Sequence, residues 1–102
     1  MSQDNVLSML GLCKRAGKVV SGEFSTEKAV KEKKAKLVIV ATDASDNTKK
    51  LFRNKCTFYN VPFYMYSKKA DLGHSLGQEM RTSVAVLDDN FANAVIQKLN
   101  NM

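Results

Sequence analysis

The segment that most constrains the fold is residues 37–41, an unbroken aliphatic run with the sequence LVIVA. A strand with one face in solvent alternates apolar and polar residues, and this run does not alternate. Both of its faces must therefore be covered, as in a sheet that carries helices on each side. The run is also far too short to cross a lipid bilayer, so we expect no association with membranes.

Helical and extended patterns alternate along the whole chain. We predict helices at residues 2–16, 24–34, 45–59, 68–76 and 89–99. We predict strands at residues 18–21, 36–41, 62–66 and 82–87. This alternation favours an α/β fold with a sheet of about four strands and helices on both faces. At 102 residues the chain is expected to form a single domain, residues 1–102.

Short polar side chains mark where the predicted helices begin, because they accept hydrogen bonds from the free N–H groups of a first turn. The candidate caps are Ser2, Asp43 or Ser45, Ser67, and Asp88 or Asp89. Two glycines fall within predicted helices. Gly11 predicts the close approach of another element, and Gly73 predicts a break in the fourth helix.

Residues typical of enzymes, metal sites and cofactor sites are sparse. The sequence contains neither a phosphate-binding loop of the GxxxxGK[ST] type nor a GxGxxG motif. Cys13 and Cys56 lack the spacing of metal ligands, and His74 is the only histidine. We therefore expect no catalytic residues, no metal and no cofactor. The cysteines are interpreted as buried thiols of a cytoplasmic protein.

Positive charge is concentrated in the first two thirds of the chain. Residues 1–69 contain 14 Lys or Arg and 6 Asp or Glu, whereas residues 70–102 contain 2 and 4. Such asymmetry is typical of a basic face that binds a polyanion, although lysine-rich surfaces are also common in soluble proteins. Candidate phosphate contacts are Lys14, Arg15, Lys18 and Lys33.

Two segments are candidates for direct contact with nucleic acid. The turn Ser21, Gly22, Glu23, Phe24, Ser25 leads into a predicted helix, whose first N–H groups can hold a phosphate or a base edge. Lys28 follows one turn later and can reach the same place. The second segment is the loop 77–82, in which Met80 can pack on an unstacked base and Arg81 can bind phosphate. Alone, each segment is a weak signal.

Several blocks of the sequence resemble the kink-turn RNA-binding ribosomal-protein family, which contains archaeal large-subunit protein seven-Ae and eukaryotic protein thirty-e. The similarity is greatest to short bacterial members of YlxQ type. The blocks are GEFSTEKAV (22–30), AKLVIVATD (35–43), VPFYMYSKKADLG (61–73) and GQEMR (77–81). Their order and spacing carry the resemblance, which extends from about residue 6 to residue 99.

The resemblance implies a three-layer α/β/α sandwich with a four-stranded mixed sheet, and recognition of a sharply bent RNA with tandem sheared G·A pairs. Of the family pattern G-x-N-E-x-x-K, Gly22 and Lys28 match, whereas Phe24 and Ser25 replace the Asn-Glu pair that reads guanine edges. The segment Glu79, Met80, Arg81 corresponds to the family's apolar loop over the extruded bases.

The leading interpretation is a cytoplasmic, monomeric, non-enzymatic protein that binds structured, kink-turn-like RNA and is associated with ribosomal or other structured RNA. The alternative is a protein-interaction or assembly module that kept the fold but lost specific RNA reading. An exposed Phe24 beside the glycine turn would suit the alternative as a docking anchor.

Overall fold

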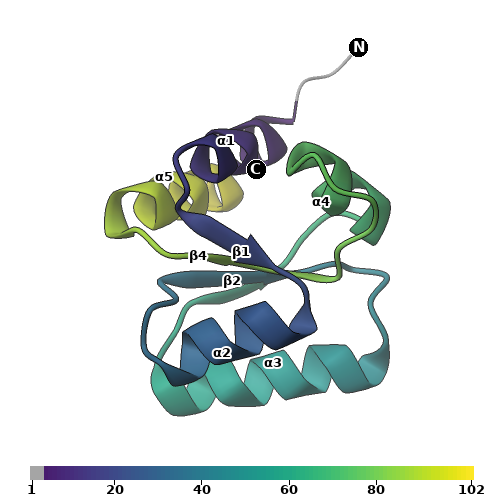
Figure 1. The fold of residues 1–102 in the computed structure, drawn as a ribbon, viewed down its shortest axis with the longest axis vertical. Helices are drawn as coiled ribbons and strands as arrows, with labels where there is room; N and C mark the ends of the chain where they lie inside the picture. Colours follow the sequence, from purple (N-terminus) through teal and green to yellow (C-terminus); the bar gives the residue numbers. More distant parts are fainter. Residues whose placement is uncertain (1–3) are drawn as a thin grey trace.

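The computed structural model describes residues 4–102 and has helices and strands in the predicted alternation (Figure 1). The helices are α1 (Asn5–Arg15), α2 (Glu23–Lys31), α3 (Asp46–Tyr59), α4 (Lys69–Ser75) and α5 (Asp89–Asn100). The strands are β1 (Val19–Ser21), β2 (Leu37–Val40), β3 (Phe63–Met65) and β4 (Ser83–Val86).

The four strands form one mixed sheet in the order β1-β4-β2-β3. Strand β4 pairs antiparallel with β1 and β2, and β2 pairs parallel with β3. Every residue of the two central strands, β2 and β4, is buried. The prediction that residues 37–41 are covered on both faces is therefore confirmed.

Helices α2 and α3 cover one face of the sheet, and α1, α4 and α5 cover the other (Figure 1). The predicted three-layer α/β/α sandwich is thus confirmed. Its core is formed by side chains from all three layers. The largest fully buried ones are Phe52, Leu10, Leu37, Ile39 and Leu72.

The sheet has two ends, which matter for the placement of the candidate site. Ser21, Val40, Met65 and Ser83 lie together at one end, because β1, β2 and β3 finish there and β4 begins there. We call it the turn end. Helices α2, α3 and α4 each follow a strand that finishes at this end, so all three begin there.

Two predicted helix caps are confirmed and one is wrong. Ser45 caps α3 by accepting from the Thr48 N–H at 3.1 Å, and Asp88 caps α5. The predicted Ser67 cap of α4 is wrong, because Ser67 takes the left-handed conformation with φ of 66°. The Lys69 N–H instead donates to Asp43 Oδ1 at 2.8 Å, so a residue distant in sequence caps the helix.

The first two helices differ from prediction at their boundaries. Asp4 caps α1 by accepting from the Leu7 N–H at 2.9 Å, whereas the predicted cap, Ser2, lies outside the described residues. Helix α2 begins at Glu23 and ends at Lys31, three residues before the predicted end. Lys33 has a φ of 61°, which a continuing right-handed helix does not allow.

The two helical glycines allow backbones to approach closely. The predicted close approach at Gly11 is confirmed, because a Cβ there would lie 3.1 Å from the Ser75 carbonyl oxygen. The predicted break at Gly73 is wrong, because α4 continues through it. A Cβ at Gly73 would overlap the Glu79 carbonyl oxygen. Gly73 therefore lets the loop 77–82 pack directly on α4.

Candidate nucleic-acid interface

The glycine turn joins β1 to α2 in a conformation that only glycine adopts readily. Gly22 has φ 94° and ψ 155°. Its N–H donates to the Ser83 carbonyl at 2.9 Å, and its carbonyl accepts from the Thr26 N–H at 2.9 Å. No side chain caps α2, so the N–H groups of its first turn are left for an external acceptor.

The loop 77–82 lies against this turn. Arg81 Nε donates to Ser21 Oγ at 3.0 Å, across 60 positions of sequence. The Arg81 N–H donates to the Lys69 carbonyl at 3.0 Å, which ties the same loop to α4. The structure thus brings together two segments that the sequence could only propose separately. We refer to residues 21–25, Lys28 and 77–82 as the turn–loop surface.

Two large apolar side chains on the turn–loop surface face solvent. Phe24 is 79% exposed and Met80 is 58% exposed. Lys28 is also exposed, one helical turn after Phe24, while Ser25 is half-buried. Glu23 approaches α3, where its carboxylate lies 3.4 Å from Thr48 Oγ1. Exposed aromatic and thioether groups beside a cation are suited to stacking on unpaired bases.

The other predicted cations do not lie with the turn. Lys18 precedes β1 and Lys33 follows α2, so both are at the end of the sheet opposite Gly22. Lys14 and Arg15 form the last turn of α1, which leads to Lys18. Lys18 and Lys33 are therefore separate from the glycine turn, whereas Arg15 lies beside α4, where it lines a hollow with His74 and Ser75.

Four lysines that the sequence analysis did not select lie at or near the turn end. Lys49 and Lys50 belong to the first turns of α3, and Lys68 and Lys69 lie where α4 begins. Asp43 and Asp46 lie at the same end, so its charge is mixed. The order of strands and helices could have predicted where these lysines lie. Helices that follow strands of the same direction begin at the same end of the sheet, and three helices of this chain do so.

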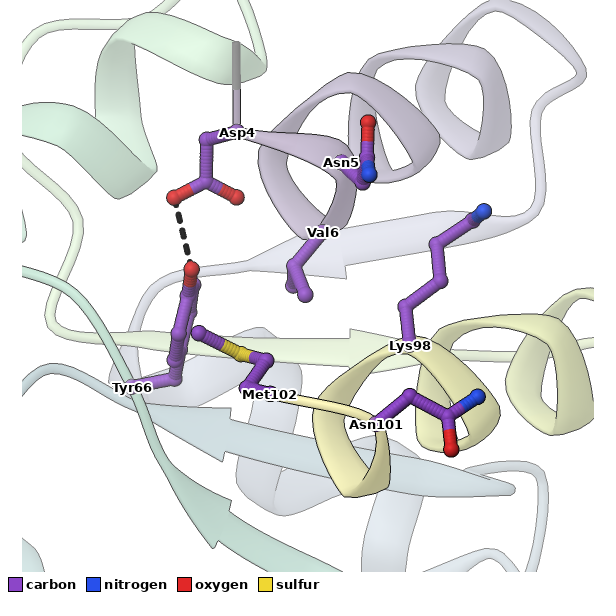
Figure 2. A pocket seen from close by; sticks show the side chains of 7 residues that line it. All are labelled: Asp4, Asn5, Val6, Tyr66, Lys98, Asn101 and Met102. Carbon is purple, nitrogen blue, oxygen red and sulfur yellow. Dashed lines mark hydrogen bonds between the residues drawn. The ribbon is translucent and has the colours of Figure 1, made fainter. Parts of the chain in front are cut away.

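A separate hollow of about 350 Å³ lies between the start of α1 and the end of α5 (Figure 2). Tyr66 points into it and donates to Asp4 Oδ2 at 2.6 Å. Burial, and then this hydrogen bond, raises the pKa of Tyr66 to about 12. The hollow is on the α1 and α5 face of the sheet, whereas Phe24 belongs to α2 on the other face.

Neither cysteine is available for chemistry in the folded state. Cys13 and Cys56 are buried and unbonded, and burial raises the pKa of each thiol to about 11. Among residues 4–102, no group of His, Cys, Asp and Glu is arranged to hold a metal ion. Within the same range, no helix is long and apolar enough to span a membrane.

Comparison with known proteins identifies the family. Residues 4–96 match the model of the ribosomal protein L7Ae/L30e/S12e/Gadd45 family. The chain is 47% identical over 92 residues to the RNA-binding protein YlxQ of Bacillus subtilis (strain 168), covering 90% of this chain and 92% of that protein. It is 31% identical over 104 residues to the large ribosomal subunit protein eL30 of Dictyostelium discoideum, covering 97% of this chain and 89% of that protein.

A solved structure agrees with these sequence matches. The structure of a protein with unknown function from Bacillus halodurans C superimposes with a TM-score of 0.93 at 32% identity, covering 96% of this chain and 99% of that chain. The resemblance inferred from the glycine turn, the aliphatic strand and the GQEMR loop is therefore confirmed. The chain belongs to the ribosomal protein L7Ae/L30e/S12e/Gadd45 family.

Proposed function

We propose that this protein is a monomeric, non-enzymatic RNA-binding protein of the cytoplasm. It recognises structured RNA of the kink-turn type and associates with ribosomal RNA. The proposal is supported by two of its relatives, one of which is an RNA-binding protein and the other a ribosomal protein. The observation that carries it is the Arg81–Ser21 contact, which joins the glycine turn and the loop 77–82 into one surface.

Each part of the turn–loop surface has a role in this proposal. Gly22 lets the backbone approach the RNA, and the free N–H groups of α2 donate to a phosphate or to an acceptor on a base edge. Lys28 contacts a guanine edge or a phosphate. Met80 packs on a base extruded at the bend, because its side chain is exposed beside the turn.

Phe24 and Ser25 offer different contacts to bases at the bend than an Asn-Glu pair would. A phenyl ring cannot hydrogen-bond a base edge, but it offers a flat apolar surface, and stacking of a base on an aromatic side chain contributes about 1–3 kcal/mol. Ser25 retains one hydroxyl that can donate or accept. We therefore expect this protein to depend more on unstacked bases, and less on base-edge hydrogen bonds, than a protein with an Asn-Glu pair.

Titration of a kink-turn RNA, beside the same RNA with its G·A pairs mutated, tests the proposal. We expect the mutated RNA to bind more weakly at every salt concentration. Equal binding to both RNAs, driven by salt alone, would exclude specific recognition of the bend.

Lys28 on α2 and Lys33, which follows α2, provide a comparison of two lysines. Lys28→Ala should weaken kink-turn binding by about 1–3 kcal/mol, because Lys28 lies on the turn–loop surface. Lys33→Ala should preserve discrimination between the two RNAs and lower the salt dependence by at most about one unit of slope, because Lys33 lies at the opposite end of the sheet. Equal affinity of Lys28→Ala and wild type would remove Lys28 from the site.

A protein-docking function is the second candidate. A groove of about 280 Å³ runs beside Phe24 along the edge strand β1, with Val20 and Leu87 among the residues that line it. An exposed aromatic side chain next to an apolar groove resembles the anchor of a protein interface. This candidate is favoured if the two RNAs bind equally and Phe24→Ala leaves that binding unchanged.

A further inference from the structure

We propose that Arg81 is a positioning residue that fixes the loop 77–82 against the glycine turn, so that Met80 faces the RNA, rather than a ligand of phosphate. The role in RNA binding rests on the proposed function. The structural role belongs to the free protein and is tested without RNA.

The side chain of Arg81 is engaged within the protein. Its Nε donates to Ser21 Oγ at 3.0 Å, one terminal nitrogen donates to the Met80 carbonyl at 3.0 Å, and the other donates to Gln78 Oε1 at 3.1 Å. These contacts use all three nitrogens of a planar guanidinium, whose fork geometry fixes their directions. We call this set of hydrogen bonds the Arg81 bridge.

Backbone hydrogen bonds attach the loop to α4 and, through the Thr82 carbonyl, which accepts from the Ala41 N–H at 2.9 Å, to the residue that follows β2. The Gln78 N–H donates to the Gly73 carbonyl at 2.9 Å, and the Arg81 N–H donates to the Lys69 carbonyl at 3.0 Å. In the described part of the chain, the bond from Arg81 to Ser21 is the only side-chain hydrogen bond between the loop and the glycine turn. The side chain of Arg81 therefore adds a direct link between the two halves of the turn–loop surface, beside the backbone pairing of β1 with β4.

The Arg81 bridge also explains how an exposed methionine can contribute to binding. Met80 is 58% exposed, so its own packing does not fix its position. Its carbonyl accepts from Arg81, which fixes the backbone that carries the side chain. A contact group already held in its bound position loses less conformational entropy on binding. Arg81 therefore raises affinity without touching the RNA.

Arg81→Lys distinguishes a positioning residue from a ligand of phosphate. Lysine keeps the charge and binds phosphate, but it cannot form the forked contacts of the guanidinium. We expect this variant to bind kink-turn RNA about tenfold more weakly, with the same salt dependence as wild type. Ser21→Ala should weaken binding in the same direction, and the double variant should bind no more weakly than Arg81→Lys. Wild-type affinity of either single variant would overturn the proposal, as would fully additive losses.

Arg53→Lys is the matched control. Arg53 also contacts protein groups, the Met65 sulfur at 3.9 Å and the Phe63 ring, but these lie on β3, at the opposite edge of the sheet from β1. We expect its RNA affinity to equal that of wild type. A loss equal to that of Arg81→Lys would show that any Arg→Lys change weakens binding, and would overturn the proposal.

Amide hydrogen exchange of the free protein tests the bridge independently. The Gln78 and Arg81 amides, both hydrogen-bonded to α4, should exchange at least several-fold faster in Arg81→Lys than in wild type, because the loop loses its side-chain attachment to the glycine turn. Equal exchange would overturn the proposal. If wild type fails to discriminate the two RNAs, the proposed function fails, while hydrogen exchange still decides whether Arg81 fixes the loop.

Discussion

Replacement of Gly22 by alanine isolates the contribution of backbone conformation to the turn–loop surface. A Cβ added at Gly22 would meet no atom within 4 Å, so the substitution creates no steric clash with neighbouring residues. Its cost comes from the backbone, because φ of 94° with ψ of 155° is a region that alanine rarely occupies. The turn cannot relax freely, because Gly22 is hydrogen-bonded to Ser83 on one side and to Thr26 on the other.

The expected magnitude follows from that conformation. A residue forced into a sparsely populated region costs about 1–3 kcal/mol, which for a domain of this size corresponds to a fall in Tm of about 4–8 °C per kcal/mol. Gly17→Ala is the matched control. Gly17 also has a positive φ, 72°, and open space around it, but it lies before β1 and away from the turn–loop surface.

Urea denaturation and RNA titration together provide the assay. We expect both alanine variants to be destabilised by about 1–3 kcal/mol, because both glycines have positive φ. Only Gly22→Ala should lose affinity for kink-turn RNA when both variants are fully folded. A loss of stability below about 0.5 kcal/mol for Gly22→Ala, with normal RNA binding, would refute the argument that this conformation is required.

Three other perturbations test packing and ionisation. Gly73→Ala places a methyl group on the backbone of the following loop and should cost about 3 kcal/mol in urea denaturation, whereas a loss below about 1 kcal/mol would show that the loop moves aside freely. Tyr66→Phe removes the hydrogen bond to Asp4 and should cost about 1 kcal/mol near neutral pH. Folding raises the pKa of Tyr66 from 10.0 to about 12, so its contribution to the free energy of unfolding is complete below pH 10 and is lost as pH rises towards 12. The free energy of unfolding of Tyr66→Phe should therefore fall less between pH 10 and pH 12 than that of wild type. An equal fall in the two proteins would contradict this reasoning. Cys13 and Cys56, whose thiol pKa values burial raises to about 11, should react with iodoacetamide only on unfolding, and fast labelling of the native protein would contradict their burial.

The layered fold was predictable because its strongest signals are local. The aliphatic run 37–41 requires cover on both faces, and the alternation of helix and strand supplies it. The errors occur where tertiary contacts override local preference. Asp43 caps α4 from a distance and replaces Ser67, and the left-handed Lys33 ends α2 early. Gly73 was misread because its role depends on a loop that packs on it, which helix propensity does not describe.

The candidate site was predictable in its parts but not in its arrangement. Gly22, Lys28 and Met80 were selected from local patterns, yet the turn and the loop meet through the pairing of β1 with β4 and the contact between Ser21 and Arg81, which are far apart in sequence. The cations were harder to place, because charge counting does not say at which end of the sheet a lysine lies. Lys33 was selected with Lys14, Arg15 and Lys18 as a phosphate contact, yet it follows α2, at the end of the sheet opposite Gly22.

The pairing of β1 with β4 positions the turn–loop surface independently of the side chains exposed on it. The glycine turn follows β1 and the loop 77–82 precedes β4, so the hydrogen-bonded ladder between these strands helps to set the distance between them. Phe24 and Ser25 lie outside the buried core. Positions 24 and 25 can therefore be exchanged, including for an Asn-Glu pair, at little thermodynamic cost. Substitution at these two positions therefore changes the exposed surface and leaves the fold in place.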